Sequence, residues 1–288
     1  MRKVSLIVIL LLITLITNGC FKRDTMEDID IYTTAYPIEY IVSTLYKEHA
    51  QINSIYPNDV NINQYTLTEK QIRDYSKAHL FIYNGLSKEI DYALDLINTN
   101  QNIKIIDAAM GMEYTNYVEE IWLDPANLLM LAQNIRNGFH EYIENPYLKK
   151  EIDDNYDYLK LTISELDAEM KDIVSDAKYK TIVVGSDLLK FLEKYNLNVI
   201  SLEENEELTA KTINDVTTMI QNEEIKYIYL INNEKPNNTI NNLLKDNKLE
   251  LLSIHSISNL NEKQRENKED YITLIKANIE LIKKELYK

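Results

Sequence analysis

Short apolar segments alternate with amphipathic segments along two stretches of the chain, and this alternation limits the folds that it can adopt. In the first stretch the segments rich in β-branched and aromatic residues are 29–37, 51–59, 79–85 and 103–109. In the second stretch they are 180–186, 198–202, 225–233 and 249–256. The segments between them place apolar residues three and four positions apart, which is typical of helices. Strands that alternate with helices at this pitch predict parallel βαβ units.

A segment without glycine, residues 145–177, separates the two stretches and predicts one long helix. A coiled coil is the alternative, but the heptad pattern is not sustained. We therefore predict an α/β protein of two lobes, residues 29–140 and 178–288, each with a mainly parallel sheet flanked by helices. One linking helix within residues 141–177 joins them. Because open α/β sheets bind ligands beyond the carboxyl ends of their strands, the cleft between the lobes is the expected site.

The first residues have the pattern of a secretory signal. Arg2 and Lys3 precede an uninterrupted apolar run, residues 4–17, which is too short for a comfortable membrane span. We predict that residues 1–19 are a signal peptide and that the rest of the chain is extracytoplasmic.

The chain has a single cysteine, Cys20, which cannot form an internal disulfide. It follows Gly19 at the predicted cleavage point, and this pair after an apolar run resembles the lipobox of bacterial lipoproteins. We predict that Cys20 is lipidated and anchors the protein to the cell membrane through residues 20–28, a short tether. Ordinary secretion with an incidental cysteine is the alternative.

Acidic residues outnumber basic ones, and the formal net charge is −15. Removing residues 1–19 would remove two basic and no acidic residues, which makes the charge −17. Such a charge argues against binding nucleic acid or an anionic surface. It is compatible with a cationic ligand, although a solvated acidic surface is the more common reason for such a charge. We expect a monomer.

Four segments resemble, in order, the metal-receptor lipoproteins of zinc and manganese ABC importers. They are TEKQIRDYSKAHLFIYNG (68–85), WLDPANLLMLAQNI (122–135), KTIVVGSDLLKFLEKYNL (180–197) and EDYITLIKANIELIKKEL (269–286). The resemblance covers nearly the whole chain after the signal peptide. It implies a solute-binding lipoprotein that binds a divalent metal ion between its lobes and delivers it to a membrane permease.

The resemblance also implies four metal-ligand positions, which in the family are mostly histidines. Here Asn63, Glu120 and Asp187 occupy three of them, and His255 occupies the fourth, where the alignment is loosest. One nitrogen and three oxygens form a harder ligand set than histidine-rich zinc sites. This favours manganese or iron(II), or calcium or magnesium, as the transported ligand, although zinc also accepts histidine with carboxylates.

Two other functions remain open. A family member that has lost its metal could bind another small solute or act as an adhesin-like surface lipoprotein. An enzyme is not expected, because the chain contains none of the common nucleophile-elbow, zinc-protease, P-loop or dinucleotide motifs. Glu120 and Asp187 could in principle be a glycosidase pair, but nothing else in the sequence supports that chemistry.

The remaining distinctive residues receive structural interpretations. We expect His79 to contact a nearby backbone group, and His49 and His140 to lie at the surface. Asp124–Pro125 predicts a helix start, since Asp interacts favourably with the helix dipole and Pro is preorganised in the first turn. The only tryptophan, Trp122, is expected to pack at the boundary between the lobes.

Overall fold

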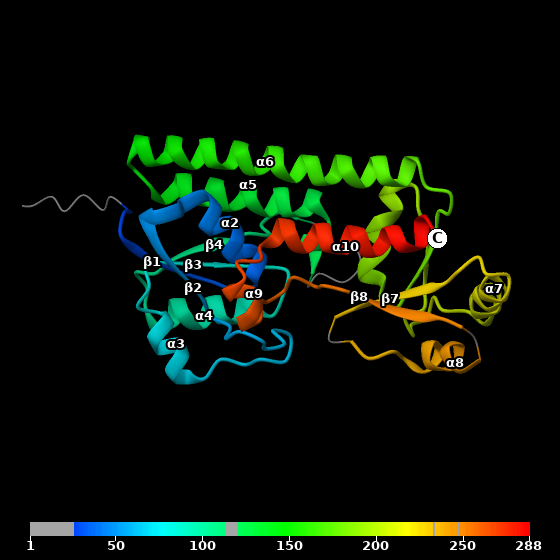
Figure 1. Cartoon of the computed structure of the whole chain (residues 1–288). Coiled ribbons are helices and arrows are strands. Elements are labelled where there is room, and N and C mark those ends of the chain that lie inside the picture. The colour runs from blue at the N-terminus through cyan, green and yellow to red at the C-terminus, as the bar shows by residue number, and fades with distance from the viewer. Residues whose placement is uncertain (1–25, 113–119, 233, 247) are drawn as a thin grey trace, which may run out of the picture.

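The computed structural model describes residues 26–112, 120–232, 234–246 and 248–288. Two parallel sheets lie at opposite ends of the molecule, and the long helix α6 (Pro146–Ser175) runs past both (Figure 1). Within the described ranges, no helix is long and apolar enough to cross a membrane. The predicted signal peptide and Cys20 lie outside the described residues. Met26, assigned above to the tether, is already buried in the core.

The N-terminal lobe contains a four-stranded parallel sheet in the order β2-β1-β3-β4. Its strands are β1 (Ile29–Thr33), β2 (Ala50–Ser54), β3 (Leu80–Tyr83) and β4 (Lys104–Asp107). Its helices are α2 (Tyr36–Tyr46), the short 3-10 helix η1 (Lys47–His49), α3 (Glu69–Tyr75) and α4 (Glu89–Thr99). All four residues of β3 are buried, as expected for an inner strand with helices on both faces.

The C-terminal lobe repeats this topology in the order β6-β5-β7-β8, again all parallel. Its strands are β5 (Thr181–Val184), β6 (Asn198–Ser201), β7 (Tyr227–Ile231) and β8 (Glu250–Ile254). Its helices are the 3-10 helix η3 (Asp187–Tyr195), α7 (Ala210–Gln221) and α8 (Asn238–Asp246). The predicted α/β fold of two parallel-sheet lobes is confirmed.

Three long helices lie against the two lobes. α5 (Pro125–Tyr142) follows the short 3-10 helix η2 (Ile121–Leu123) and packs against α6 and against α2 and β4 of the N-terminal lobe. α10 (Tyr271–Leu286) packs against α6 and against β5 and β8 of the C-terminal lobe (Figure 1). The helix within the predicted linking segment is α6, and the side chain of its N-cap residue, Asn145, accepts from the Tyr147 N–H.

Three details of the predicted elements were wrong. The first strand ends at Thr33 instead of continuing to Pro37, because Pro37 lies in the first turn of α2. The segment after β5 is a 3-10 helix where an α-helix was expected. The five-residue helix α9 (Glu262–Glu266) was not predicted, since it is too short and polar to show periodicity.

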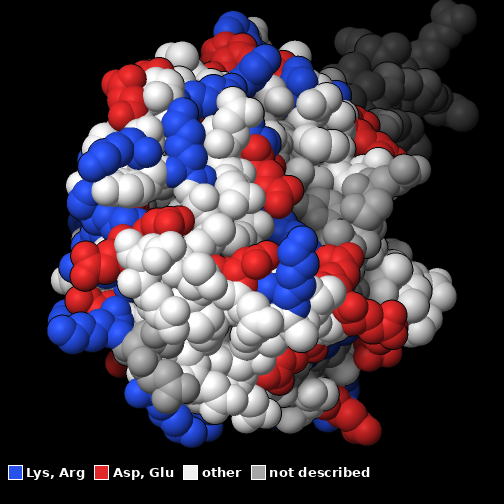
Figure 2. All heavy atoms as spheres, turned by 90° about the vertical axis from the view of Figure 1, so that its right-hand side faces the viewer, with Lys and Arg blue, Asp and Glu red and all other residues white. Residues whose placement is uncertain are grey.

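Strand β5 shows how the two hydrophobic cores are divided. Ile182 and Val184 point into a large core that includes the connecting helices and the N-terminal lobe. Val183, between them, points to the other face, into a small core with residues of α7 and α8. Alternate residues of a strand face opposite sides of the sheet, so one apolar run serves both cores. On the outer face of the C-terminal lobe, acidic and basic side chains are interspersed (Figure 2).

The cap of α10 gives a prediction of moderate size. Asp270 Oδ1 accepts a hydrogen bond from the Thr273 N–H at 2.8 Å, and the Asp270 N–H donates to Thr273 Oγ1 at 2.8 Å. Asp270→Ala should lower the free energy of unfolding by about 1 kcal/mol in urea denaturation, because it leaves a helix N–H uncapped. Asp270→Ser, which keeps an acceptor, should restore most of the loss. Equal losses in both variants would contradict a capping role.

Candidate metal centre

The four predicted ligands lie in segments that follow strands or begin helices. Asn63 lies in the connection after β2, and Glu120 directly precedes η2. Asp187 is the first residue of η3, two residues after β5, and His255 directly follows β8. In parallel sheets these connections gather at the carboxyl edge, where ligands bind.

Asn63 and Glu120 form the N-terminal half of the candidate site. Asn63 is exposed and its Nδ2 donates to Glu120 Oε1 at 3.4 Å, whereas Glu120 is 8% exposed. The Lys88 ammonium donates to the carbonyls of Asn63 and Tyr65, at 3.0 and 2.8 Å. The connection that carries Asn63 is therefore tied to the start of α4.

A buried carboxylate, Glu89, supports the same connection. Its Oε1 accepts from the Tyr56 hydroxyl at 3.1 Å, and its Oε2 accepts from the Asn84 N–H at 3.0 Å. Burial raises the pKa of the Glu89 carboxyl. Sequence reasoning missed Glu89, and the one available signal was an acidic residue at a helix start, where carboxylates often accept backbone N–H bonds.

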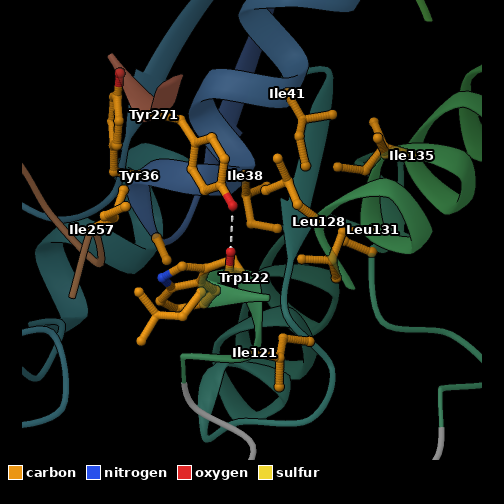
Figure 3. Close-up of a cluster of buried hydrophobic side chains, with 14 of the residues drawn as sticks. Tyr36, Ile38, Ile41, Ile121, Trp122, Leu128, Leu131, Ile135, Ile257 and Tyr271 are labelled. Atoms are coloured by element: carbon orange, nitrogen blue, oxygen red, sulfur yellow. Dashed lines mark hydrogen bonds between the residues drawn. The ribbon is translucent and has the colours of Figure 1, made fainter. Parts of the chain in front are cut away.

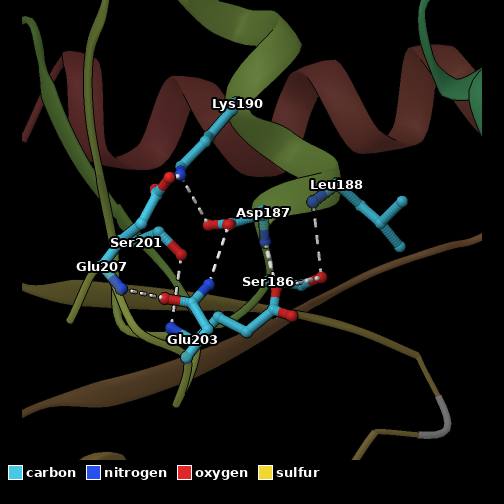
Figure 4. A network of polar contacts seen from close by, with 8 residues as sticks. Ser186, Asp187, Leu188, Lys190, Ser201, Glu203 and Glu207 are labelled. Atoms are coloured by element: carbon cyan, nitrogen blue, oxygen red, sulfur yellow. Dashed lines mark hydrogen bonds and ion pairs between the residues drawn. The ribbon is translucent and has the colours of Figure 1, made fainter. Parts of the chain in front are cut away.

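Asp187 begins the C-terminal half of the site and is held by three polar neighbours (Figure 4). Its Oδ2 accepts from Asn205 Nδ2 at 3.0 Å, and its Oδ1 lies 3.0 Å from Lys190 Nζ. Its backbone N–H donates to Glu203 Oε2 at 2.6 Å. The Asp187 side chain is only 5% exposed.

His255 contributes an imidazole whose two nitrogens already have neighbours. Nδ1 accepts from the Ile257 N–H at 2.9 Å, and Nε2 lies 2.9 Å from Gln264 Nε2. The Asn278 side chain bonds both the N–H and the carbonyl of His255 and so positions its backbone. Burial lowers the pKa of His255, which favours the neutral form that a metal ligand needs.

The structure thus brings Asn63 and Glu120 into contact. Asp187 and His255 each have their own local partners. Across the described ranges, no group of three or more His, Cys, Asp or Glu side chains is close enough to hold a metal ion. The residues therefore form separate half-sites, and Glu120 and Asp187 are the carboxylates that could neutralise a cation.

Trp122 packs between the lobes, as predicted. Its indole N–H donates to the Ser256 carbonyl at 2.8 Å, just beyond β8 of the C-terminal lobe. The Tyr271 hydroxyl donates to the Trp122 carbonyl at 2.6 Å (Figure 3). In the same region the Tyr36 N–H donates to the Ser258 carbonyl at 2.9 Å. The segment after β8 is therefore joined to the N-terminal lobe next to His255.

The other three histidines have structural partners. His79 Nδ1 accepts from the Asp30 N–H at 3.0 Å, which confirms its predicted contact with the backbone. His49 and His140 are partly exposed and pair with Glu151 and Asp153.

Two α/β lobes with parallel sheets, linked by the long helix α6, make up the fold, and polar side chains lie in the segments that follow their strands. Residues 31–285 match the family described as "ZnuA: Zinc-uptake complex component A periplasmic", and the chain belongs to this family.

Several known proteins are similar to the chain. The zinc-binding lipoprotein AdcA of Streptococcus pneumoniae R6 is 20% identical over 98% of this chain and 61% of its own length. The chain therefore spans about three fifths of this relative. A metal ABC transporter substrate-binding lipoprotein of Lactococcus lactis is 24% identical over 94% of this chain and 93% of its own.

Solved structures share the fold. The crystal structure of the Zn(II)-bound ZnuA-like domain of S. pneumoniae AdcA has a TM-score of 0.73 at 20% identity. The match covers 91% of this chain and 100% of that domain.

Proposed function

We propose that the protein is an extracytoplasmic solute-binding lipoprotein of an ABC importer, which binds a divalent metal ion between its lobes and delivers it to a membrane permease. Membership of the zinc-uptake family supports this, as do the names of its lipoprotein relatives. The observation that carries the proposal is that two buried carboxylates, Glu120 just before η2 and Asp187 at the start of η3, stand at the positions where the resemblance implies metal ligands.

In this proposal each ligand has a distinct role. Glu120 and Asp187 neutralise the two charges of the cation, Asn63 offers an amide oxygen, and His255 offers a neutral imidazole. Because three of these donors are oxygens, manganese or iron(II) is favoured, with zinc also accepted. The helices and hydrogen bonds between the lobes favour a small shear motion on binding over a wide hinge opening.

A second function is favoured by one observation: Asp187 is already paired with a cation of the protein itself, Lys190. A receptor whose carboxylate is neutralised internally is suited to a solute other than a metal ion. Such a protein would be a family member that has lost its metal and binds another small solute or a surface partner.

A metal panel separates these functions. The chain without its signal peptide, with Cys20→Ser, is mixed with Mn²⁺, Fe²⁺, Zn²⁺, Mg²⁺ or Ca²⁺, and the melting temperature is recorded. A metal present at about 100 times its Kd should stabilise the protein by about 2.7 kcal/mol. Glu120→Ala and Asp187→Ala should each abolish the shift, and Glu69→Ala, an exposed acid on α3, should not.

The results have clear consequences. No shift with any of the five ions at millimolar concentration would rule out the metal function and leave the second one. A shift that survives both Glu120→Ala and Asp187→Ala would show that the metal binds elsewhere.

A further inference from the structure

Lys190 places a positive charge where the transported cation would bind. Its Nζ lies 3.0 Å from Asp187 Oδ1 and 2.9 Å from Glu207 Oε2 (Figure 4). Asp187 and Lys190 are three residues apart on η3, and in a 3-10 helix side chains at this spacing lie above one another. The spacing of three residues along the helix thus brings the ammonium to the carboxylate.

The two carboxylates that share the ammonium differ in their exposure. The Asp187 side chain is 5% exposed, whereas that of Glu207 is 73% exposed and that of Lys190 is 29% exposed. The ammonium therefore lies between a buried partner and a partner in solvent. It can leave Asp187 without losing its second ion pair.

A bound cation could replace Lys190 as the partner of Asp187. Among the residues that the structure describes, none donates a hydrogen bond of good geometry to Asp187 Oδ1. The ion pair with Lys190 is therefore the main interaction that stabilises this oxygen. Oδ2, by contrast, accepts from Asn205. Oδ1 is the atom with lone pairs left to coordinate a cation.

We propose that Lys190 sets the affinity for the transported metal ion by competing with it for Asp187 Oδ1, an inference that rests on the proposed function. Without metal, the ammonium neutralises the buried carboxylate. When a divalent ion binds, like charges so close repel strongly, and the ammonium turns to Glu207 alone. Lys190 thereby weakens binding and eases release of the ion to the permease.

A purely structural role for Lys190 leads to different expectations. In that case the lysine would only tie η3 to the loop that carries Glu207, and its loss would change stability without tightening metal binding. The competition leads to a second expectation. Glu207 offers the ammonium an alternative partner, so it should favour metal binding only while Lys190 is present.

The test is a double-mutant cycle on the Cys20→Ser chain, with Kd measured by calorimetry for Mn²⁺ and Zn²⁺ separately. Lys190→Met should bind the metal ion about tenfold more tightly. A neighbouring charge typically changes the equilibrium constant of an ionic site by this factor or more. Glu207→Gln should bind several-fold more weakly. In the Lys190→Met background, Glu207→Gln should have almost no further effect.

Controls keep the test independent of folding and of net charge. Lys211→Met removes an exposed lysine of α7 and should leave Kd unchanged. Lys190→Gln replaces the methionine variant if that one does not fold, as judged by circular dichroism.

The outcomes distinguish this inference from the proposed function. Unchanged Kd in Lys190→Met, while Asp187→Ala still abolishes binding, would overturn the competition and leave the proposed function intact. Binding by Lys190→Met alone would overturn the proposed function, because the wild-type protein would exclude the metal, while it would still show that Lys190 and the ion compete for Asp187. If neither protein binds any metal, the proposed function fails and the inference fails with it.

Discussion

Replacing Trp122 with alanine is expected to lower the free energy of unfolding by about 3–5 kcal/mol, the range for large aromatic residues in protein cores. The side chain is 1% exposed and lies in the cluster of Figure 3, between the two lobes. Its removal leaves a cavity and takes the indole donor from the Ser256 carbonyl. Urea denaturation followed by circular dichroism measures the loss, because the variant contains no tryptophan to report by fluorescence.

The variant Trp122→Phe separates the two contributions. Phenylalanine keeps most of the apolar volume but cannot donate to Ser256, so we expect a loss of about 1–2 kcal/mol. A loss below about 1 kcal/mol in Trp122→Ala would mean that the junction closes over the cavity. Trp122 would then not be the residue that holds the lobes together.

The bonds around Trp122 limit the motion of the two lobes relative to each other. Arg265, on α9 beyond β8, makes two parallel hydrogen bonds to the carboxylate of Glu39 on α2, at 2.7 and 2.9 Å. Bidentate pairs of this kind are among the stronger polar contacts. Together with the Trp122–Ser256 bond, they hold the segment that carries His255 against the N-terminal lobe. Under the proposed function, motion on metal binding is therefore expected in the connection that carries Asp187.

Much of the fold could be predicted from the sequence because it depends on local patterns. β-branched runs such as 180–186 form inner strands in any parallel sheet, and their order along the chain predicts the βαβ topology. Caps are equally local. Thr68 accepts from the Gln71 N–H and Asp124 accepts from the Ala126 N–H, as their positions before helical segments indicate.

The partners of the site residues could not be predicted in this way. The sequence resemblance named Asp187, but not its contact with Lys190, because a spacing of three residues permits an ion pair without showing that one forms. Glu89 and Glu285 have the appearance of surface acids on amphipathic helices, yet both are buried. Glu89 accepts from the hydroxyl of the distant Tyr56, and Glu285 accepts from the N–H groups of Lys226 and Tyr227. Local sequence patterns do not show these long-range partners.

Glu285 gives the second large prediction. It is 0% exposed, and its carboxylate accepts from the N–H groups of Lys226 and Tyr227, at the start of β7, and pairs with Lys288. Glu285→Ala should lower the free energy of unfolding by about 3–5 kcal/mol, because it removes a buried acceptor from two backbone donors and one ammonium. Urea denaturation followed by tryptophan fluorescence and circular dichroism measures the loss.

The matched variant Glu285→Gln tests whether the charge or the acceptor matters. Its amide oxygen can still receive one strand N–H, whereas the ion pair with Lys288 is lost, so a loss of about half that of the alanine variant is expected. Glu280→Ala, which removes an exposed acid from the same helix, should change stability by less than about 0.5 kcal/mol. If Glu285→Ala were as mild as Glu280→Ala, water would be replacing the carboxylate at the start of β7, and the bonds of Asn278 and Tyr229 would be the polar contacts that matter between α10 and the second sheet. A full loss in the alanine variant would instead establish that the buried carboxylate is a major part of that junction.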